Sequence, residues 1–584
     1  MQRNRIERTA SKQWRGSVRR IISATVYNLS CFTHGCSTGW VSGVLGNEAL
    51  TGGAWLAALP CLVALPAAPF FAVLADARGR KAGAFCICIS FILSWSLAAW
   101  CGPRGVWAAR VAAGAGGAGA LALAPLYCAE IAPRTRGLAA MPALACSCGI
   151  LFAYAAGGML SAHALSLSMA VPPSALLVSL IWLPETPSFL ISIGRVQDAA
   201  KIICWFDGSD FREDLTDVIE QQEVRIRTSD CYGSRREAMR RQDSDAFQPM
   251  LKRSSGLESN SDKKTEQSAC KELFRHRRSR RALLSCAVLI CAAAGSGAGA
   301  VNSFAAAVLR HSSHAVPLLN MTAYNFTIND GSLPRPLFET SEAGAILCGA
   351  ALVLGATIAT ITVDKLGRKM LLLWSCSGIT CCLIVLGVYC DPHLRLHSWY
   401  SQRLWPYTDE DTQSKESIEA FNITSNVNYT KPWDYRIGVE SENLTDSFMM
   451  STKAARTHAE EQRMWAPVAL LSTVLFLYNI GLGSVPFVLV SELFSINVRS
   501  LASSLLISWT WLSSFLLLRY YGTIAVSLGL HGTYYISASI TFLASLYIFL
   551  VLPETKGKSQ EQIEEILNGP MLVLRSTKKN QNQR

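Results

Sequence analysis

The feature that most constrains this chain is a series of long, almost uncharged apolar runs. About twelve such runs, each close to the roughly 20 residues that a helix needs to cross a bilayer, alternate with polar segments. They lie at 21–45, 54–75, 83–102, 104–127, 138–160, 164–183, 282–309, 342–363, 370–390, 464–490, 501–527 and 530–552. The chain of 584 residues is also 50% hydrophobic and only 16% charged. This pattern predicts an all-α polytopic membrane protein.

Basic residues are concentrated in alternate segments between these runs. The net charge of +12 therefore indicates membrane topology rather than nucleic-acid binding. The basic residues precede the first run and follow the second, fourth and eighth runs: Arg3, Arg5, Arg8, Lys12, Arg15, Arg19, Arg20, Arg78, Arg80, Lys81, Arg134, Arg136, Lys365, Arg368 and Lys369. Because the positive-inside rule places such segments in the cytosol, we expect a multi-pass protein of the plasma membrane with both termini cytosolic.

Glycosylation sequons support the same topology. Asn-x-Ser/Thr sequences occur in the two segments that this topology places outside the cell, at Asn320, Asn325, Asn422, Asn428 and Asn443. A sixth sequon, at Asn28, lies inside the first apolar run, and we interpret it as fortuitous. The sequence therefore predicts a glycoprotein whose glycans lie after the seventh and the ninth runs.

Two long polar segments divide the chain into domains. We expect an N-terminal six-helix bundle over 1–190, a C-terminal six-helix bundle over 282–565 and a cytosolic tail over 566–584. Between the bundles, 191–281 is expected to be a cytosolic linker, partly helical and partly disordered, which is available to cytosolic partners. The external loop 391–463 shows nothing that indicates an enzyme site.

A short charged motif occurs twice, each time where an apolar run ends. Ala75–Lys81 reads ADARGRK, and Val363–Lys369 reads VDKLGRK. Acidic residues follow in the same order in both halves: Asp76, Glu130 and Glu185, then Asp364, Glu492 and Glu554. The first two acids are 54 residues apart in the first half and, once the 73-residue external loop is removed, 55 apart in the second. The chain is therefore an internal duplication, a kind of repeat on which many secondary transporters are built.

The residue types of this motif suit a gate made of charges. Its Gly can adopt backbone angles that a larger residue resists, and its Asp can accept hydrogen bonds from N–H groups that begin the next helix. Its Arg and Lys can pair with carboxylates of neighbouring helices. We therefore predict a cytosolic gate of Asp76, Arg80, Glu130, Arg136, Glu185, Asp364, Arg368, Glu492, Arg499 and Glu554. Helix capping with positive-inside charge is the simpler interpretation, and the duplication beside matching acids favours the gate.

These residues resemble the sugar porters of the major facilitator superfamily, which include the facilitative glucose and insect trehalose transporters. The resemblance covers 20–195 and 280–565. Its motifs are D-x-x-G-R-K at Asp76–Lys81 and Asp364–Lys369, Arg110 with Gly114 and Gly116, PLYCAEIAPRTRG at Pro125–Gly137, PETP at Pro184–Pro187, G-x-G-x-x-P…E-L-F at Gly481–Phe494 and PETKG at Pro553–Gly557. The third of these is one residue shorter at its end than the family's pattern. The resemblance implies twelve helices in two pseudo-symmetric six-helix bundles (the MFS fold), a central site and alternating access.

One glycine-rich stretch has two interpretations. GAGGAG at Gly114–Gly119 matches the dinucleotide-binding fingerprint, but it lies inside an apolar run and no strand precedes it. Small residues that let membrane helices pack closely explain it better. Arg110, near the start of the same run, is either a partner in the polar network or a snorkelling interfacial residue. The resemblance favours the first alternative, so we place Arg110 with the cytosolic gate.

The substrate site is where the chain departs from the family. A sugar needs several hydrogen-bonding side chains, because each hydroxyl loses water when it enters a site. The family's Q-Q-x-x-G-x-N signature in helix 7 corresponds here to Ala293–Gly299, which contains neither Gln nor Asn. The candidates that remain for substrate binding are Ser37, Thr38, Asn302, Ser303, Phe487, Thr510, Trp511 and Ser514. Each of them is alternatively an interhelical packing group.

Two functions therefore stay open. The first is facilitative transport of a sugar or similar small solute by alternating access. The second is a transporter-like nutrient sensor or partner-binding membrane protein without transport. Both gate motifs are intact, which favours transport. No nucleophile–base or metal-ligand pattern occurs in the sequence, so we expect no enzyme activity, metal or cofactor. The expected partners are the solute, the lipid bilayer and cytosolic partners of 191–281, but no nucleic acid.

Energy coupling is predicted from the first apolar run. The resemblance implies that proton-coupled sugar porters carry an Asp at the position that Ser37 occupies here, within Gly35–Gly39. A serine cannot take up and release a proton near neutral pH, whereas a carboxylate can. The neighbouring His34 is titratable, and we interpret it as a packed, neutral histidine. We therefore predict uniport.

Overall fold

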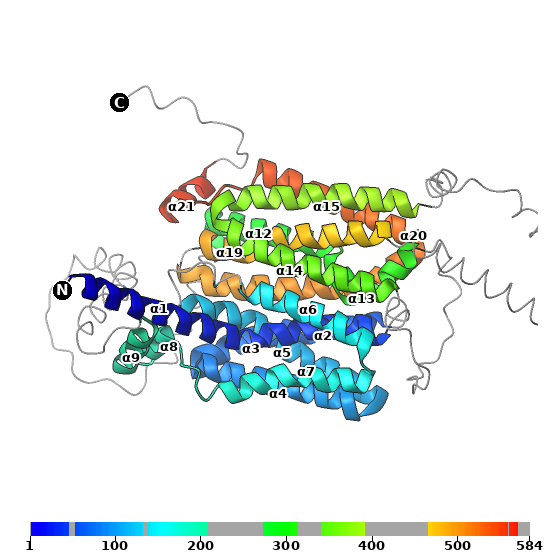
Figure 1. Ribbon diagram of the computed structural model, residues 1–584. Helices are drawn as coiled ribbons and strands as arrows, with labels where there is room; N and C mark the ends of the chain where they lie inside the picture. Colours follow the sequence, from blue (N-terminus) through cyan, green and yellow to red (C-terminus); the bar gives the residue numbers. More distant parts are fainter. Residues whose placement is uncertain are drawn as a thin grey trace, which may run out of the picture.

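The computed structural model of the chain describes residues 2–45, 53–131, 138, 141–207, 273–313, 340–391, 465–494, 496–558 and 560–569. Within these ranges all regular elements are helices, and the long ones lie side by side in one bundle (Figure 1). The five predicted external glycosylation sites and most of the linker 191–281 fall outside the described residues. The predicted all-α fold is confirmed.

The N-terminal half contributes seven labelled helices to the bundle and two short ones beyond it. The long helices are α1 (Gln2–Tyr27), α2 (Leu29–Leu45), α3 (Ala54–Arg78), α4 (Arg80–Trp100), α5 (Gly102–Ile131), α6 (Met141–Met159) and α7 (Ala162–Ser179). The short ones are α8 (Pro187–Ser192) and α9 (Val196–Asp207), at the start of the predicted linker. α1 begins well before the first apolar run and continues into α2, because backbone hydrogen bonds at Asn28 bridge the two.

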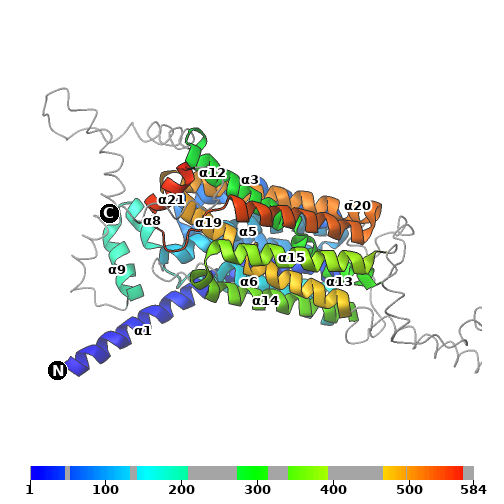
Figure 2. The ribbon, with the colours of Figure 1, turned by 90° about the horizontal axis from the view of Figure 1, so that it is seen from above.

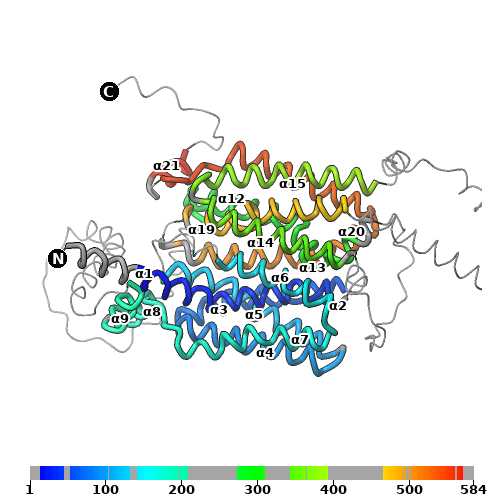
Figure 3. Tube along the Cα trace, in the orientation of Figure 1, coloured from blue at the N-terminus to red at the C-terminus, as the bar shows by residue number. Residues whose placement is uncertain are grey.

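The C-terminal half repeats this arrangement and lies against the first, as the colours of Figure 3 show. Its helices are α12 (Arg277–Gly295), α13 (Ala298–Ser313), α14 (Thr340–Leu366), α15 (Arg368–Cys390), α19 (Val485–Leu493), α20 (Ile496–Leu550) and α21 (Gln560–Asn568). The long α20 contains two helices that meet at Gly529, whose φ of 74° is left-handed. These two helices correspond to the last two predicted runs.

Ten stretches of the described chain are long and apolar enough to cross a membrane. Three of them, Arg277–Leu309, Trp465–Val490 and Leu501–Leu550, contain a break, and the last covers two predicted runs. The first predicted run corresponds to the end of α1 and all of α2. The helices therefore cover every run that the sequence predicts.

The two ends of the bundle differ in character. α1, α8, α9 and α21 gather at one end (Figures 1 and 2). We call it the charged end, because Arg80 and Arg368 begin α4 and α15 there, hydrogen-bonded to the glutamates that precede α8 and α21. α9 packs against α1, and α21 packs against α12. We call the opposite end the far end.

Two helices that the sequence predicts as continuous are broken near the middle of the bundle. The run 282–309 divides into α12 and α13 at Gly297, whose φ of 78° ends the first helix. The run 464–490 divides at a turn over 481–484, and Pro486 then lies in the first turn of α19. Gly and Pro permit these breaks, because Gly adopts left-handed angles and Pro suits the first turn of a helix. The expectation of two unbroken helices was therefore wrong.

Close helix packing explains the glycine-rich stretch of α5. A Cβ atom on Gly114 would collide with the backbone of Pro60 in α3, and one on Gly119 would meet Ile87 and Phe71. The packing interpretation of GAGGAG is therefore confirmed, because these positions have no room for a side chain.

Candidate functional site

A cavity of about 220 Å³ lies between the two halves of the bundle. It is large enough to hold a small solute or several waters. The cavity is lined by residues of α2, α3, α5 and α6 from one half and of α12, α13, α19 and α20 from the other. All eight residues predicted for substrate binding line it: Ser37, Thr38, Asn302, Ser303, Phe487, Thr510, Trp511 and Ser514.

Arg110 lies in this cavity rather than in the gate, which corrects the expectation from the sequence. It lies on α5, 20 residues before Glu130. A helix rises about 1.5 Å per residue, so the two are about 30 Å apart along the axis. The match to a family motif identified Arg110 as functional, but it gave no information about which end of the helix the side chain serves.

Backbone oxygens anchor the Arg110 guanidinium. Its Nε donates to the Leu56 carbonyl at 3.0 Å, and its Nη1 donates to the Ser37 carbonyl at 2.9 Å and to the Ser37 hydroxyl at 3.0 Å. The Leu56 carbonyl is available because Pro60, four residues later in α3, has no N–H to donate to it. The guanidinium also lies over the Trp40 ring, 5.8 Å from its centroid. These contacts hold Arg110 in one orientation at the cavity wall.

Trp511 and Asn302 bring unpaired polar atoms to the cavity lining. The buried Trp511 Nε1 and the buried Asn302 Oδ1 have no hydrogen-bond partner among the described residues. The Trp511 ring lies edge-on to the imidazole of His34, with centroids 5.5 Å apart. Buried polar groups are normally paired, so an unpaired donor and an unpaired acceptor beside one cavity indicate a place for a polar ligand.

The first copy of the charged motif forms a compact network at the start of α4. Arg80 Nη2 contacts Glu130 Oε1 at 2.7 Å, and both side chains are largely buried, with 9% and 12% exposed. The two carboxylate oxygens of Glu185 accept hydrogen bonds from the backbone N–H groups of Arg80, at 3.0 Å, and Lys81, at 3.1 Å. Glu185 therefore caps α4 while Arg80 joins α4 to α5.

The second copy has nearly the same geometry at the start of α15. Arg368 Nη2 contacts Glu492 Oε1 at 2.8 Å. Glu554 accepts hydrogen bonds from the backbone N–H groups of Arg368, at 3.1 Å, and Lys369, at 3.2 Å. Each arginine also donates through Nη1 to a carbonyl five residues earlier, Ala75 in one half and Val363 in the other. The internal duplication is thus preserved at the level of individual atoms.

The caps come from the distant glutamates and not from the Asp of the motif, which corrects one expectation. Asp76 is 67% exposed and lies 3.5 Å from Arg80 Nη1. Glu185 and Glu554 occupy the position in front of the helix instead, because Gly79 and Gly367 leave space for a carboxylate there. Of the other predicted gate residues, Arg136 lies outside the described residues, and the side chains of Asp364 and Arg499 are not described.

Hydrogen bonds join the two halves in the middle of the bundle and towards the far end. Asn479 Nδ2 donates to Ser147 Oγ at 2.9 Å, and Tyr154 Oη donates to the Asn302 carbonyl at 2.6 Å. The Ala306 N–H donates to Ser42 Oγ at 3.1 Å. Asn302 and Ala306 flank a kink at Phe304, where the backbone of α13 leaves the helical region. The kink therefore coincides with hydrogen bonds that join the two halves beside the cavity, whose lining includes Asn302.

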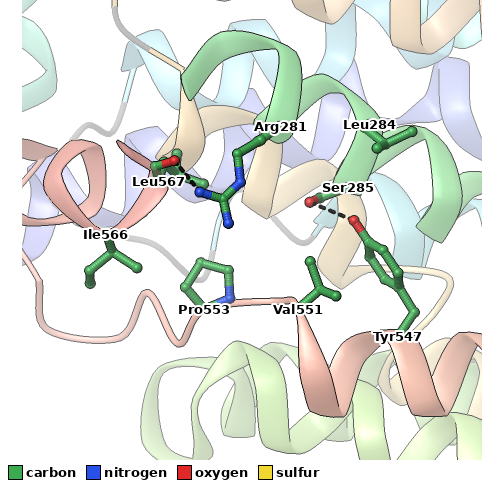
Figure 4. Close-up of a pocket in the computed structure, with 8 residues that line it drawn as sticks. All are labelled: Arg281, Leu284, Ser285, Tyr547, Val551, Pro553, Ile566 and Leu567. Carbon is green, nitrogen blue, oxygen red and sulfur yellow. Dashed lines mark hydrogen bonds between the residues drawn. The ribbon is translucent and has the colours of Figure 1, made fainter. Parts of the chain in front are cut away.

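A second, much smaller pocket lies at the charged end between α12, α20 and α21. Arg281 Nη1 donates to the carbonyls of Leu567, at 2.5 Å, and Gly569, at 2.7 Å, and Ser285 pairs with Tyr547 at 3.0 Å (Figure 4). Its volume of about 10 Å³ is too small for a solute. Arg281 instead satisfies carbonyls at the end of α21 and fixes this helix to the bundle.

Sequence analysis did not assign several residues of the cavity to the site. Tyr478, Cys61 and Cys146 also line it, together with His34. Tyr478 lies three residues before the turn that breaks the run 464–490, and a polar aromatic residue close to such a turn was the available signal. The two cysteines lie in helix interiors, where nothing in the sequence distinguishes them from packing residues.

Comparisons with known proteins agree with the fold and the motifs. A family model described as Major Facilitator Superfamily matches residues 26–400, and one described as Sugar (and other) transporter matches residues 447–567. The facilitated trehalose transporter Tret1 of Bombyx mori is 24% identical over 548 residues, which are 93% of this chain and 82% of that protein. Solute carrier family 2, facilitated glucose transporter member 6 of Homo sapiens is 26% identical over 499 residues, 84% of this chain and 78% of that protein.

A solved structure shows the same fold. The xylose transporter XylE from E. coli, in an inward open conformation, superposes with a TM-score of 0.59 at 16% identity, over 94% of this chain and 99% of that one. The second family model confirms the resemblance to sugar porters that the motifs carry, and the first covers well over half of the sequence. The chain belongs to the major facilitator superfamily.

Proposed function

We propose that this protein is a facilitative transporter that moves a sugar or similar small solute across a membrane by alternating access. The observation that carries the proposal is a cavity lined by both halves of an internally duplicated bundle, with every predicted binding residue at its wall. The relatives named for trehalose, glucose and xylose transport support a solute of sugar size. All of these relatives are named as transporters, in line with the expectation that the chain is not an enzyme.

We propose further that the charged end faces the cytosol. Arg80, Lys81, Arg368 and Lys369 lie at that end, which the positive-inside rule assigns to the cytosolic side. The far end then faces outward, and the cross-half bonds of Ser42, Tyr154 and Asn302 close the cavity on the external side. This placement fits a plasma-membrane protein with both termini in the cytosol and external glycans.

Transport is proposed to be energy-independent. Ser37 occupies the position where an acid is implied for proton-coupled relatives, and its hydroxyl accepts a hydrogen bond from Arg110 at 3.0 Å. Because residue 37 is a serine, Arg110 has no carboxylate beside it whose protonation could couple proton movement to solute transport. The two charged networks act as gates, because each links helices of its own half and can rearrange when the halves separate at the cytosolic end.

Uptake into proteoliposomes that contain the purified protein tests this function. We expect labelled solute from a panel of sugars, polyols and organic ions to equilibrate across the membrane without accumulation, and a protonophore to leave the initial rate unchanged. Accumulation that collapses with the protonophore would contradict uniport. If no member of the panel enters faster than into empty liposomes, the sensor or partner-binding function becomes the better account of the fold, with the linker 191–281 as its contact to other proteins.

A further inference from the structure

The cavity contains a positive charge and no negative one. Among the described residues that line it, none is Asp or Glu, and Arg110 is the charged one. A guanidinium stays protonated under all physiological conditions. Any solute that enters this cavity therefore meets a fixed positive charge.

The partners of Arg110 leave this charge uncompensated. Nε and Nη1 donate to two carbonyls and one hydroxyl, all of which are neutral. The hydrogen bonds of Arg110 to described residues involve Nε and Nη1 and leave Nη2 free to face an occupant of the cavity, although the residue as a whole is only 5% exposed. Burial of an ion without a counter-ion is strongly unfavourable. An anion beside Nη2 would remove this penalty.

The neutral residue opposite Arg110 points to the same conclusion. The hydroxyl of Ser37 lies 3.0 Å from Nη1, at the position where a carboxylate would neutralise the guanidinium within the protein. Because this chain supplies a hydroxyl there, an anionic occupant of the cavity would be the partner that supplies a negative charge to the guanidinium.

The unpaired atoms of Trp511 and Asn302 define the rest of the occupant. Trp511 Nε1 is a donor and can serve an oxygen of an acid or hydroxyl group. Asn302 Oδ1 is an acceptor and needs an O–H or N–H from the solute. A simple inorganic anion such as chloride would pair with the Arg110 guanidinium, but it has no hydrogen to donate to Asn302 Oδ1.

We propose that the cavity binds a small hydroxylated carboxylate, the chemical class of the sugar acids. Its carboxylate pairs with Arg110, and one of its hydroxyls donates to Asn302 Oδ1. This inference rests on the proposed transport function and names the substrate class of the same site. It also implies that each transport cycle moves one negative charge, so the membrane potential biases the distribution of the solute by about tenfold per 59 mV.

Binding to the purified protein is the first test. Matched pairs such as glucose and glucuronate, or galactose and galacturonate, differ only in whether the last carbon is a hydroxymethyl group or a carboxylate. We expect the acid of at least one pair to bind about tenfold tighter or more than its neutral partner, measured by Trp fluorescence, because charge-assisted hydrogen bonds are the stronger ones. Equal or tighter binding of the neutral sugar in every pair, or no binding of any acid, overturns the proposal.

Variants identify the residue that is responsible. Arg110→Gln should abolish the preference for the acid, and Arg110→Lys should retain part of it because the charge remains. Arg104→Gln is the matched control, since Arg104 lies on the same helix, is exposed and is not among the residues that line the cavity. An acid preference that survives Arg110→Gln contradicts the assignment. The comparison of matched ligands on the unmodified protein keeps the test valid if Arg110→Gln does not fold.

Proteoliposomes with an imposed potassium diffusion potential separate this inference from the proposed function. The acid should accumulate when the interior is positive and be depleted when it is negative, whereas a neutral sugar should not respond. Transport of neutral sugars alone would overturn the inference and leave the proposed function intact. Tight binding of the acid without transport of any solute would overturn the proposed function and leave the substrate class intact.

Discussion

Gly79 and Gly367 each directly precede a helix, and each has a backbone conformation that other residues rarely adopt. Their φ values are 93° and 90°, in the left-handed region. A Cβ atom on either glycine would also touch the carboxylate that caps the helix, Glu185 in one half and Glu554 in the other. Conformation and contact thus both require glycine, and loss of the glycine disturbs the capping glutamate together with the turn.

We predict that Gly79→Ala destabilises the protein by more than the left-handed backbone alone explains. Placing a residue with a Cβ atom at this positive φ lowers the free energy of unfolding by about 1–2 kcal/mol, and displacement of the Glu185 carboxylate lowers it further. Gly194→Ala is the matched control, because Gly194 also has a positive φ, of 78°, but a Cβ atom there would meet nothing within 4 Å. Thermal unfolding in detergent measures both. If the two variants lose the same stability, the carboxylate contact contributes nothing.

Prediction from sequence succeeded for these glycines and for the pairing of each arginine with a glutamate of its own half, and it failed for the helix caps. The short motif contains the Gly and the Arg, so their roles follow from local chemistry. The capping carboxylate lies 105 residues from Arg80, and the motif offered a nearer acid, Asp76. Likewise, composition alone could not place Arg110, because its position depends on a carbonyl freed in another helix by Pro60. Local pattern predicts backbone geometry, whereas partner choice depends on tertiary packing.

The helices around the cavity are interrupted at three places. Pro60 frees a carbonyl for Arg110, Gly297 divides α12 from α13, and the turn over 481–484 precedes α19. Residues beside all three interruptions line the cavity, including Pro60, Gly299 and Leu482. Irregular backbone at membrane depth is tolerated where it is buried in protein or lines a polar cavity. The hydrophobic runs predicted the number and extent of the helices but not these breaks, because Gly and small residues also occur in unbroken membrane helices.

A first prediction about the helices concerns Pro60. Replacement by Ala restores an N–H that competes with Arg110 for the Leu56 carbonyl. We expect Pro60→Ala to lower the affinity for the transported solute by several-fold through a less firmly held guanidinium. Pro66→Ala is the control, because Pro66 lies in the same helix but is exposed on the bundle surface. Binding curves should give a lower solute affinity for Pro60→Ala than for Pro66→Ala. Equal affinities of the two variants would show that the orientation of Arg110 does not depend on the Leu56 carbonyl.

The buried Arg80–Glu130 pair leads to a second prediction at this scale. Removal of one partner of a buried pair costs about 3–5 kcal/mol, because the other charge stays buried without compensation. Arg80→Glu should therefore change the transport rate and lower stability, and Arg80→Glu combined with Glu130→Arg should recover part of both. The Arg195–Asp198 pair supplies the control, since its side chains are 62% and 36% exposed and its loss should cost about 1 kcal/mol or less. If transport is unchanged in all of these variants, the network is a cap and not a gate.

In the whole molecule, the two halves are joined by hydrogen bonds towards the far end, which we propose to be the closed end of the cavity. The kink at Phe304 places Asn302 and Ala306 against the N-terminal half, and the carbonyl of the first and the N–H of the second bond to Tyr154 and Ser42. In an ordinary helix these two groups would bond to each other. The closed end is therefore held by backbone groups at a kink, whose two helical segments can move with little change elsewhere.

Alternating access requires these contacts to break once in every cycle, and a cross-link between the halves should prevent this. We predict that Ser42→Cys together with Ala306→Cys, once joined by an oxidant or a short bifunctional reagent, loses transport and regains it on reduction. The control is a bridge within one half: Cys348 lies 3.4 Å from the hydroxyl of Ser472, so Ser472→Cys offers a pair that can be joined without connecting the halves. That bridge should leave transport close to its original rate, because α14 and the helix over 465–480, which contains Ser472, belong to the same half. Full transport with the far end cross-linked would mean that solute does not pass between Ser42 and Ala306, and the alternating-access mechanism would have to be abandoned.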